Sequence, residues 1–504
     1  MSAHTRTSQL RATLAGVGTG LLLAPLFAAP AAAAPADPAQ LRAAVKVQNI
    51  MTHLKLLDGI AKANGGSRAS GTRGYDVSVT YAALAFRKAG YTVTRQPLEF
   101  RTYTENSPSV LVRESPAPGG AVAHHLLTYS GSGDVRAVAT LPGGAPTGCA
   151  AADFGAANKD SIVVVRRGDC TFATKATHAA QAGARGVVVY NNVDGELTAT
   201  LGSDFTPDLP VAGVTLAVGQ QLAAAVPAGL RLHLKADTTR EMAKTENLIA
   251  ESRGGDPDNV VMVGAHLDSV PAGPGINDNG SGSATILEVA HQMRAVNPKN
   301  KVRFALWAAE ESGLVGSTHY VTRLPAAERK KIALYLNFDM VGSPNYVRFV
   351  YDGDNSAFPP GDGSAPGPKG SGAIEKLFHD YFRSQKLESA ETAFTGRSDY
   401  GPFIAAGVDI PAGGLFTGAE GIKTAEQAKV YGGTAGAPYD ACYHQACDDM
   451  GNINRKALKE MAGAVAHAVM TYAMDTSSVG RPVGPARGTT APGVDGGHDH
   501  HATS

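Results

Sequence analysis

The sequence has no excess of charge of either sign. Its 45 lysines and arginines balance 45 aspartates and glutamates, which argues against proteins that bind nucleic acid or anionic membranes through net charge. Tryptophan occurs once and cysteine only 4 times in 504 residues. After the first 35 residues, no uncharged apolar run is long enough to span a membrane. With 43% hydrophobic residues, the chain is too apolar for disorder and too long for one small core, so we expect two or more packed units.

Residues 1–34 have the layout of a secretory signal peptide. Arg6 and Arg11 precede an apolar run from Leu14 to Phe27, and small residues follow up to Ala34. A membrane anchor is the alternative, but glycines interrupt the run, which is also short for a bilayer. We therefore expect a mature chain that begins near Ala34, is secreted to the extracellular space and has no membrane contact after cleavage.

The four cysteines favour two disulfides in an exported protein, and three pairings are possible. Cys442 and Cys447 enclose a short loop, whereas Cys149 and Cys170 flank a separate strand-rich region. This spacing favours the two local pairings. Metal binding by the thiols is the competing interpretation, but the spacing differs from that of paired zinc-binding hooks.

From Asn247 onward, buried strands alternate with amphipathic helices. We expect strands at 259–264, 302–308 and 332–338, and helices at 283–296, 371–386 and 455–474. This alternation predicts an α/β fold with a mostly parallel central sheet and helices on both faces. In such sheets, functional groups collect beyond the carboxyl ends of the strands.

The first part of the chain has helical spacing at 39–64 and 74–89, with a loop rich in glycine, serine and arginine between them, and a strand at 91–100. The residue pattern then changes. We expect a strand at 161–166, a helix at 172–184 and a strand at 186–190, which indicate a smaller inserted module. The expected organisation is a main domain at 35–110 and 239–477, an insertion at 111–238 and a disordered tail at 478–504.

Five polar segments follow predicted strands or lie in glycine-rich loops. They read GAHLDS at 264–269, GINDNGSG at 275–282, AEESG at 309–313, NFDM at 337–340 and CYHQAC at 442–447. Taken alone, a histidine after a strand is usually structural, and Asp-Asn-Gly is usually a turn. Glu310 and Glu311 are harder to dismiss, because burying two like charges is costly without a cation nearby.

Together these segments offer imidazoles and carboxylates without a thiolate. The candidate metal ligands are His266, Asp278, Glu311, Asp339 and His444. Such a set suits two zinc ions that share a bridging carboxylate. Asp268 follows His266 by two residues, a common spacing for a ligand and the acid that fixes its tautomer.

The five motifs, in this order, resemble the secreted co-catalytic di-zinc aminopeptidases, the group that includes aminopeptidase Y and bacterial leucyl-type enzymes. The resemblance covers roughly residues 40–110 and 245–475. Residues 160–172 resemble the signature of the β-rich protease-associated domain that some members carry as an insertion. The resemblance implies a zinc exopeptidase fold with two Zn²⁺ per chain, acting on peptide or protein N-termini. We expect a monomer with no nucleic acid partner.

The same resemblance implies residue roles. Asp278 is expected to bridge the metals, with His266 and Asp339 completing one site and Glu311 and His444 the other. Glu310 is the expected general base, since a carboxylate beside the attacking water can take its proton and return it to the leaving amine. Asp268 is expected to orient His266, and the hydroxyl of Tyr443 to stabilise the oxyanion.

Residues for substrate recognition are also implied. Arg397, in a GRSD segment, is expected to touch the substrate, and Met340 and Phe416 to line an apolar pocket that favours leucine, methionine or phenylalanine. Packing alone is an equally good explanation for Met340 and Phe416. Some family members bind Ca²⁺, and Asp352–Asn355 offers oxygens for it, although its spacing does not fit an EF-hand.

Two other functions compete with this interpretation. A carboxypeptidase or a glutaminyl cyclase of the same superfamily would have overlapping ligands. A degenerate peptidase kept as a peptide-binding protein would use the insertion as its working surface, but it would have lost ligands. All five candidate ligands and the expected base are present here.

Overall fold

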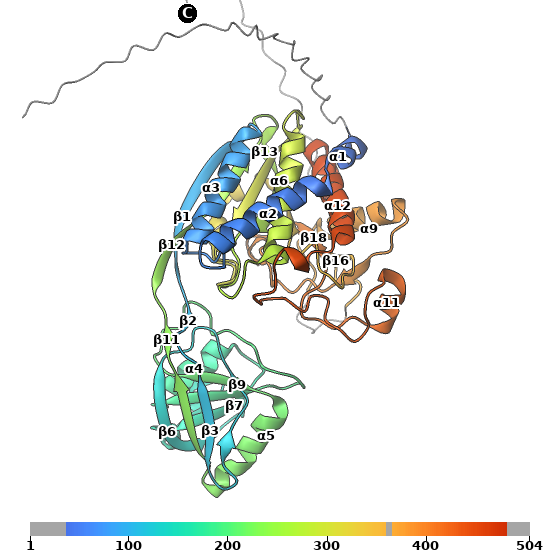
Figure 1. Ribbon diagram of the computed structural model, residues 1–504. Helices are drawn as coiled ribbons and strands as arrows, with labels where there is room; N and C mark the ends of the chain where they lie inside the picture. Colours follow the sequence, from blue (N-terminus) through green and yellow to red (C-terminus); the bar gives the residue numbers. More distant parts are fainter. Residues whose placement is uncertain (1–36, 359–364, 481–504) are drawn as a thin grey trace, which may run out of the picture.

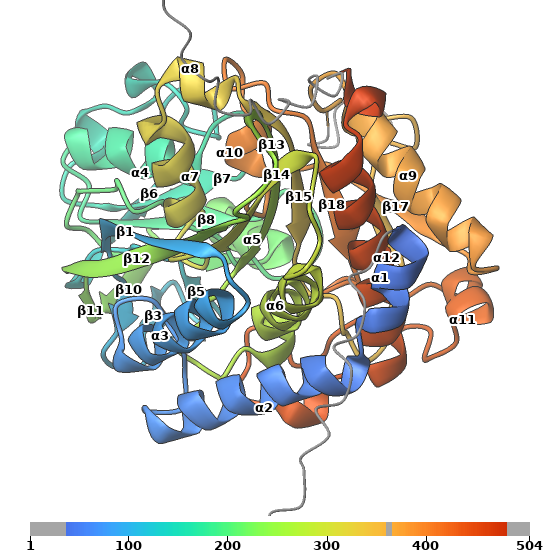
Figure 2. The same ribbon diagram turned by 90° about the horizontal axis from the view of Figure 1, so that it is seen from above.

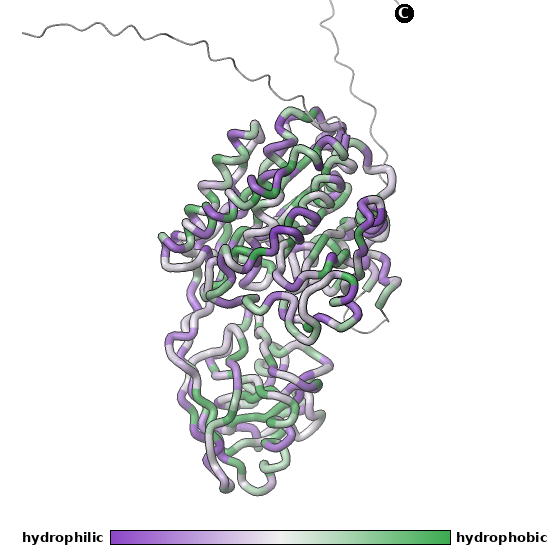
Figure 3. The backbone as a smooth tube through the Cα atoms, turned by 45° about the vertical axis from the view of Figure 1, so that its right-hand side comes forward, coloured by the Kyte–Doolittle hydropathy of each residue, from purple (hydrophilic) through white to green (hydrophobic). Residues whose placement is uncertain are grey.

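Two eight-stranded sheets organise the protein (Figure 1). The computed structural model describes residues 37–358 and 365–480. The expected signal peptide, and the expected tail beyond residue 480, lie outside the described residues. Figure 3 shows hydrophobic segments running through the interior of both units.

The larger sheet has a parallel centre and an antiparallel edge. Its strands, in spatial order, are β1 (Thr92–Arg101), β12 (Met242–Glu251), β14 (Asn300–Trp307), β13 (Asp256–His266), β15 (Ile332–Phe338), β18 (Ala412–Phe416), β16 (Phe349–Tyr351) and β17 (Ala390–Thr392). Strands β14, β13, β15 and β18 are parallel neighbours, whereas β1 and β12 pair antiparallel. The predicted α/β class is confirmed.

Helices cover both faces of this sheet (Figure 2). They are α1 (Pro38–Ala44), α2 (Val47–Ala63), α3 (Arg73–Lys88), α6 (Gly282–Met293), α9 (Ser371–Ser384) and α12 (Arg455–Met474) on one side, and α7 (Val315–Arg323) and α10 (Gly401–Ile404) on the other. Short helices α8 (Ala326–Arg329) and α11 (Ala425–Tyr431) lie in connecting segments.

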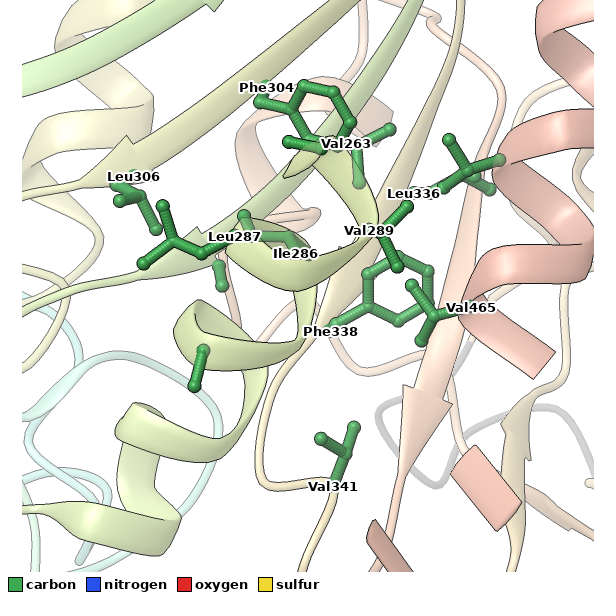
Figure 4. Packing of buried hydrophobic residues seen from close by; sticks show 14 of the residues in the cluster. Val263, Ile286, Leu287, Val289, Phe304, Leu306, Leu336, Phe338, Val341 and Val465 are labelled. Carbon is green, nitrogen blue, oxygen red and sulfur yellow. The ribbon is translucent and has the colours of Figure 1, made fainter. Parts of the chain in front are cut away.

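Alternation along the central strands fills both hydrophobic layers. Val261 and Val263 of β13 point to the α6 side, while Val260 and Met262 belong to the opposite cluster. Figure 4 shows side chains of β13, β14 and β15 meeting those of α6 and α12. The parallel strands are therefore buried on both faces, and their carboxyl ends are fixed relative to one another.

The predicted single helix at 39–64 is wrong in one respect, because it divides into α1 and α2 at Val45 and Lys46. Both residues have extended backbone. The amide of Lys46 donates to Oε1 of Glu288 across 3.2 Å, and Glu288 is buried on α6. A long-range partner thus takes a donor that a continuous helix would use.

The smaller unit lies between β1 and β12 in sequence. Its strands, in spatial order, are β4 (Gly120–Ala121), β3 (Val110–Ser115), β10 (Arg231–Ala236), β6 (Gly133–Thr140), β7 (Ile162–Arg166), β8 (Gly186–Tyr190), β9 (Val211–Val214) and β5 (His125–Leu126). Its helices are α4 (Phe172–Gln181) and α5 (Leu216–Ala225). A ribbon of β2 (Thr104–Glu105) and β11 (Thr238–Thr239) joins it to the larger unit (Figure 1). We call this smaller unit the insert.

Both predicted disulfides are present. Cys149 pairs with Cys170 in the insert, and Cys442 pairs with Cys447 in the larger unit. Within the described residues, none of the helices has both the length and the apolarity needed to cross a membrane.

Candidate active site

The polar motifs converge at the carboxyl end of the parallel sheet. His266 is the last residue of β13, Asp339 directly follows β15, and Glu311 lies in the turn after β14. Asp278 lies in the turn Ile276–Ser281 that precedes α6, at a point where the backbone is not helical. His444 comes from the loop closed by the second disulfide. Parallel strands bring these distant segments together because their carboxyl ends share one edge.

Asp278 lies between two imidazoles. Its Oδ1 is 3.2 Å from Nε2 of His266, and its Oδ2 is 3.2 Å from Nε2 of His444. Asp339 Oδ1 is 3.2 Å from His266, and Glu311 Oε2 is 3.1 Å from His444. The five side chains thus form two groups of three that share Asp278, and in each group the ligand atoms lie within 4.8 Å of one another.

The electrostatics of these groups favour bound cations. Burial alone would lower the pKa of His444, but the charges of Glu311 and Asp278 outweigh it and raise the pKa to about 11. Burial raises the pKa of Glu311 to about 7, with Asp278 contributing. Oε1 of Glu311 is buried and accepts no hydrogen bond from the described residues. A carboxylate oxygen left in this way fits a metal ligand, and the oxygen and nitrogen donors are those zinc accepts.

Glu310 directly precedes Glu311 and lines the cavity that opens over both groups. Burial raises the pKa of Glu310 well above its ordinary value. The charge of His266 lowers this pKa, whereas the nearby carboxylates Asp399, Glu311 and Asp339 raise it further. Once ionised, a carboxylate with a raised pKa is a stronger base than an ordinary glutamate. The position and chemistry of Glu310 therefore suit proton transfer.

Asp268 contacts the imidazole of His266 at Nδ1, the ring nitrogen that does not face Asp278. Nδ1 of His266 lies 3.2 Å from the carbonyl oxygen of Asp268 and 3.6 Å from its Oδ1. Both are acceptors, so Nδ1 carries the hydrogen and Nε2 faces Asp278 and Asp339. Asp268 Oδ1 also accepts the amide of Glu310 at 3.3 Å, which links the candidate ligand His266 to the expected base.

A cavity of about 540 Å³ opens over these residues. Met340, which is 2% exposed, and Phe416 line it. Arg397 lies at its margin with a side chain 73% exposed and pairs with Glu420 at 3.4 Å. Tyr443 also lines the cavity, and its ring stacks on that of His444 with 3.8 Å between centroids. Burial raises the pKa of Tyr443, so its hydroxyl remains a hydrogen-bond donor at neutral pH.

Comparison with known proteins identifies the family. Residues 247–469 match Peptidase family M28, and residues 133–222 match the PA domain. The chain is 45% identical over 457 residues to an aminopeptidase of Pseudomonas aeruginosa, covering 88% of this chain and 84% of that protein. The chain belongs to peptidase family M28.

Other relatives agree with this assignment. A probable leucine aminopeptidase 2 of Aspergillus fumigatus is 45% identical over 418 residues, covering 82% of this M28 peptidase and 80% of the relative. The solved aminopeptidase from Aneurinibacillus sp. strain AM-1 superposes with a TM-score of 0.69 at 26% identity, over 86% and 95% of the two chains. A zinc aminopeptidase from Bacillus subtilis shares the fold, with a TM-score of 0.58 at 24% identity over 84% and 94% of the two chains. The M28 peptidase is therefore a metallo-aminopeptidase.

Several residues that shape the site were missed by the sequence analysis. A buried chain of hydrogen bonds runs from Trp307 to Tyr335 Oη (2.8 Å), Asn337 Oδ1 (2.9 Å), Ser398 Oγ (2.9 Å) and Asp339 Oδ2 (2.6 Å). The indole can only donate, so it fixes the direction of the first two bonds. Of these residues, only Ser398 lies in a motif that the sequence had already singled out, the GRSD segment.

Asp448 also holds the turn that carries Asp278. It directly follows Cys447, is 2% exposed and accepts the backbone amides of Asn277 and Asp278 at 2.8 and 2.9 Å. The disulfide loop that carries His444 is thereby tied to the turn that carries Asp278. The aspartate after the second cysteine was visible in sequence, but its partners were not.

Arg68 supports the segment between His266 and Asp278. It comes from the glycine-rich loop before α3, is fully buried and donates to the carbonyls of Pro274 (2.8 Å) and Gly275 (2.5 Å). Its guanidinium thus orders the loop between the candidate ligands His266 and Asp278 through backbone contacts.

The oxygens that the Asp352–Asn355 segment offers for Ca²⁺ lie outside this cavity. Asp352 and Asp354 form a group with Glu375 beside α9. Asp352 already accepts the amides of Ser356 and Ala357 at 3.0 and 2.8 Å. We assign no calcium site to this group.

Proposed function

We propose that this M28 peptidase is a secreted di-zinc aminopeptidase that removes single N-terminal residues, with a preference for large apolar ones such as leucine. One observation carries the proposal: the carboxylate of Asp278 is shared by two ligand groups, His266 with Asp339 and Glu311 with His444. A shared carboxylate is the arrangement that places two metal ions next to each other.

The five ligands would hold two Zn²⁺, which when bound supply Lewis acidity toward the scissile carbonyl and lower the pKa of water. Glu310 takes the proton of the attacking water and delivers it to the leaving amine. The Tyr443 hydroxyl donates to the carbonyl oxygen as negative charge develops on it. Asp268 keeps His266 in the tautomer that presents Nε2.

The charge of the cavity supports an aminopeptidase over a carboxypeptidase. Among the described residues, Arg397 is the only lysine or arginine that lines it, and Glu420 already pairs with Arg397. Glu310 and Glu420 also line the cavity and are not among the proposed zinc ligands, so beside the single Arg397 their charges would favour a free α-ammonium group over a C-terminal carboxylate. Next to them, Met340, Phe416 and Tyr351 offer an apolar wall for the first side chain.

Metal analysis and hydrolysis of aminoacyl substrates test the proposal together. We expect about two zinc per chain, hydrolysis of leucine p-nitroanilide and no hydrolysis of its N-acetylated form. Glu310→Ala should fold and bind zinc but lose nearly all turnover, whereas Glu426→Ala, on the exposed first turn of α11, should behave as wild type. One zinc per chain, or an active Glu310→Ala enzyme, would refute it.

Secretion, organisation and assembly belong to the same proposal. Two disulfides support export, because such bonds persist in oxidising compartments. N-terminal sequencing of the protein from culture medium should place the mature start near Ala34. We keep the insertion at 111–238 and the main domain at 35–110 and 239–477 as proposed boundaries, with a monomer expected from light scattering.

A further inference from the structure

The insert supplies part of the wall of the catalytic cavity. Thr128, Tyr129 and Thr200 belong to insert loops, yet they line the same cavity as Glu310 and Glu311. The hydroxyl of Tyr129 also leaves the insert and reaches the larger unit. It lies 3.2 Å from the carbonyl oxygen of Ser312 and 3.0 Å from that of Arg101, and its single hydrogen is shared between these two acceptors.

Ser312 belongs to the turn that carries Glu310 and Glu311. This turn is closed from within by the amides of Gly313 and Leu314, which both donate to the carbonyl of Glu310 at 2.8 Å. Its start is held by Asp268, which accepts the amide of Glu310. The insert thus bonds to this turn at the carbonyl of Ser312, the residue directly after Glu311.

Tyr129 is itself held firmly by the insert. Thr128 is bonded on both sides, since its amide donates to Ala199 and its carbonyl accepts from Leu201, each at 2.9 Å. The backbone of Tyr129 is left-handed, with φ of 69°, and its side chain belongs to a buried hydrophobic cluster of the insert. A non-glycine residue keeps such a backbone only where its surroundings impose it. The hydroxyl is therefore presented from a fixed position.

We infer that Tyr129 is a positioning residue of the peptidase reaction. Its hydroxyl orients the Ser312 peptide, and through it the turn, so that Glu310 and Glu311 face Asp278. The insert is then a working part of the active site as well as a wall around it. This inference rests on the proposed function, because it acts through the roles assigned to Glu310 and Glu311.

A pair of Tyr→Phe variants of the full-length enzyme tests it. Tyr129→Phe removes only the hydroxyl. Tyr103→Phe is the matched control, because its ring lies 5.8 Å from that of Tyr129 and its hydroxyl donates to Glu105 at 3.2 Å on the connecting ribbon. Each variant is assayed for kcat and KM on leucine p-nitroanilide, for the rate of zinc release to a chelator, and for thermal unfolding.

Loss of one such bond should lower kcat of Tyr129→Phe about fivefold and speed zinc release by a similar factor. KM should change less than about twofold, because the variant leaves the apolar side of the pocket intact. Tyr103→Phe should retain wild-type kcat and zinc release. A variant that lost thermal stability but kept both rates would show that Tyr129 only docks the insert.

Two further outcomes would overturn the inference. An equal loss in Tyr103→Phe would assign the effect to packing of the ribbon and not to the hydroxyl. Glu310→Ala in the same assays distinguishes a failure of the proposed function from a failure of this inference alone. If it turns over like wild type, the proposed function fails and this inference falls with it. If it is inactive while Tyr129→Phe is unaffected, the inference alone is wrong.

Discussion

Ser398 donates its hydroxyl hydrogen to Oδ2 of Asp339 across 2.6 Å, while Oδ1 of Asp339 lies 3.2 Å from the candidate ligand His266. The serine thereby fixes which oxygen faces the metal site. Ser398→Ala would leave Oδ2 without this donor and free the carboxylate to rotate. We expect zinc affinity, measured by competition with a chelator, to fall about 10- to 100-fold without unfolding.

Ser371→Ala is the matched control for this prediction. Ser371 is also fully buried, and its hydroxyl accepts the amide of Ala412 at 3.1 Å, away from the ligands. This variant should lose some stability and keep its zinc affinity. Equal zinc affinities in wild type and Ser398→Ala would mean that the orientation of Asp339 depends on other contacts.

The two disulfides should separate stability from activity. Cys442–Cys447 closes a loop with a sequence separation of 5 that carries Tyr443 and His444, whereas Cys149–Cys170 spans 21 residues within the insert. By loop-closure entropy, replacing both cysteines with serine should cost about 2 kcal/mol for the short loop and about 3 kcal/mol for the long one. Activity and zinc affinity should fall only in the short-loop variant, because it releases a candidate ligand.

Two measurements on the double variants check this prediction. Urea unfolding should show the larger loss of stability without Cys149–Cys170, and leucine p-nitroanilide hydrolysis should show loss of activity only without Cys442–Cys447. If loss of Cys149–Cys170 inactivated the enzyme while loss of Cys442–Cys447 did not, the disulfide loop would have no part in holding His444.

Gly264 leaves room for the hydrogen-bond chain that ends at Asp339. A Cβ atom at Gly264 would lie 2.2 Å from Tyr335 Oη and 2.7 Å from Trp307 Nε1. Gly264→Ala should therefore displace this pair and destabilise the protein by about 1–3 kcal/mol. Because Trp307 is the single tryptophan, its fluorescence spectrum should shift in the folded variant.

Gly59→Ala is the opposite case. Gly59 lies on an exposed part of α2, where an added Cβ meets nothing within 4 Å. Alanine there should stabilise the protein by about 0.5–1 kcal/mol and leave the tryptophan spectrum unchanged. A stable Gly264→Ala protein with wild-type emission would contradict the steric argument.

Local pattern predicted much of the fold. Four strands were predicted within a residue or two of their observed bounds: the valine-rich strands at 161–166 and 186–190, and the strands at 302–308 and 332–338 that precede polar motifs. The motifs carry their own signals, because ligand chemistry restricts residue type and parallel strands place it at one edge. That the five candidate ligands share one site is the geometry expected from sequence, while their roles remain predictions.

What sequence could not supply is the pairing of distant polar groups. The break between α1 and α2 depends on Glu288, which lies 242 residues from Lys46. The bond between Tyr129 and Ser312 spans 183 residues and two units. Neither contact leaves a periodic or compositional trace, because a single hydrogen bond needs only one donor and one acceptor brought together by the tertiary fold.

His467 should make the larger unit less stable in acid. It lies on α12, where its Nδ1 is 2.9 Å from the guanidinium of Arg42 and its ring stacks on Tyr381. Because arginine can only donate, Nδ1 must accept and the imidazole is neutral. Burial, followed by the charge of Arg42, lowers its pKa from 6.5 to about 4.

The sign of the effect follows from proton uptake. Between pH 6.5 and about 4, the unfolded chain binds a proton at His467 that the folded chain does not, so this residue's contribution to stability falls as pH falls. His467→Gln keeps an acceptor for Arg42 but does not titrate. Wild type should therefore lose stability relative to His467→Gln on acidification, in urea unfolding followed by Trp307 fluorescence, which reports on the larger unit. Parallel pH profiles for the two proteins would show that His467 is protonated equally in both states, and would rule out a neutral imidazole held by Arg42.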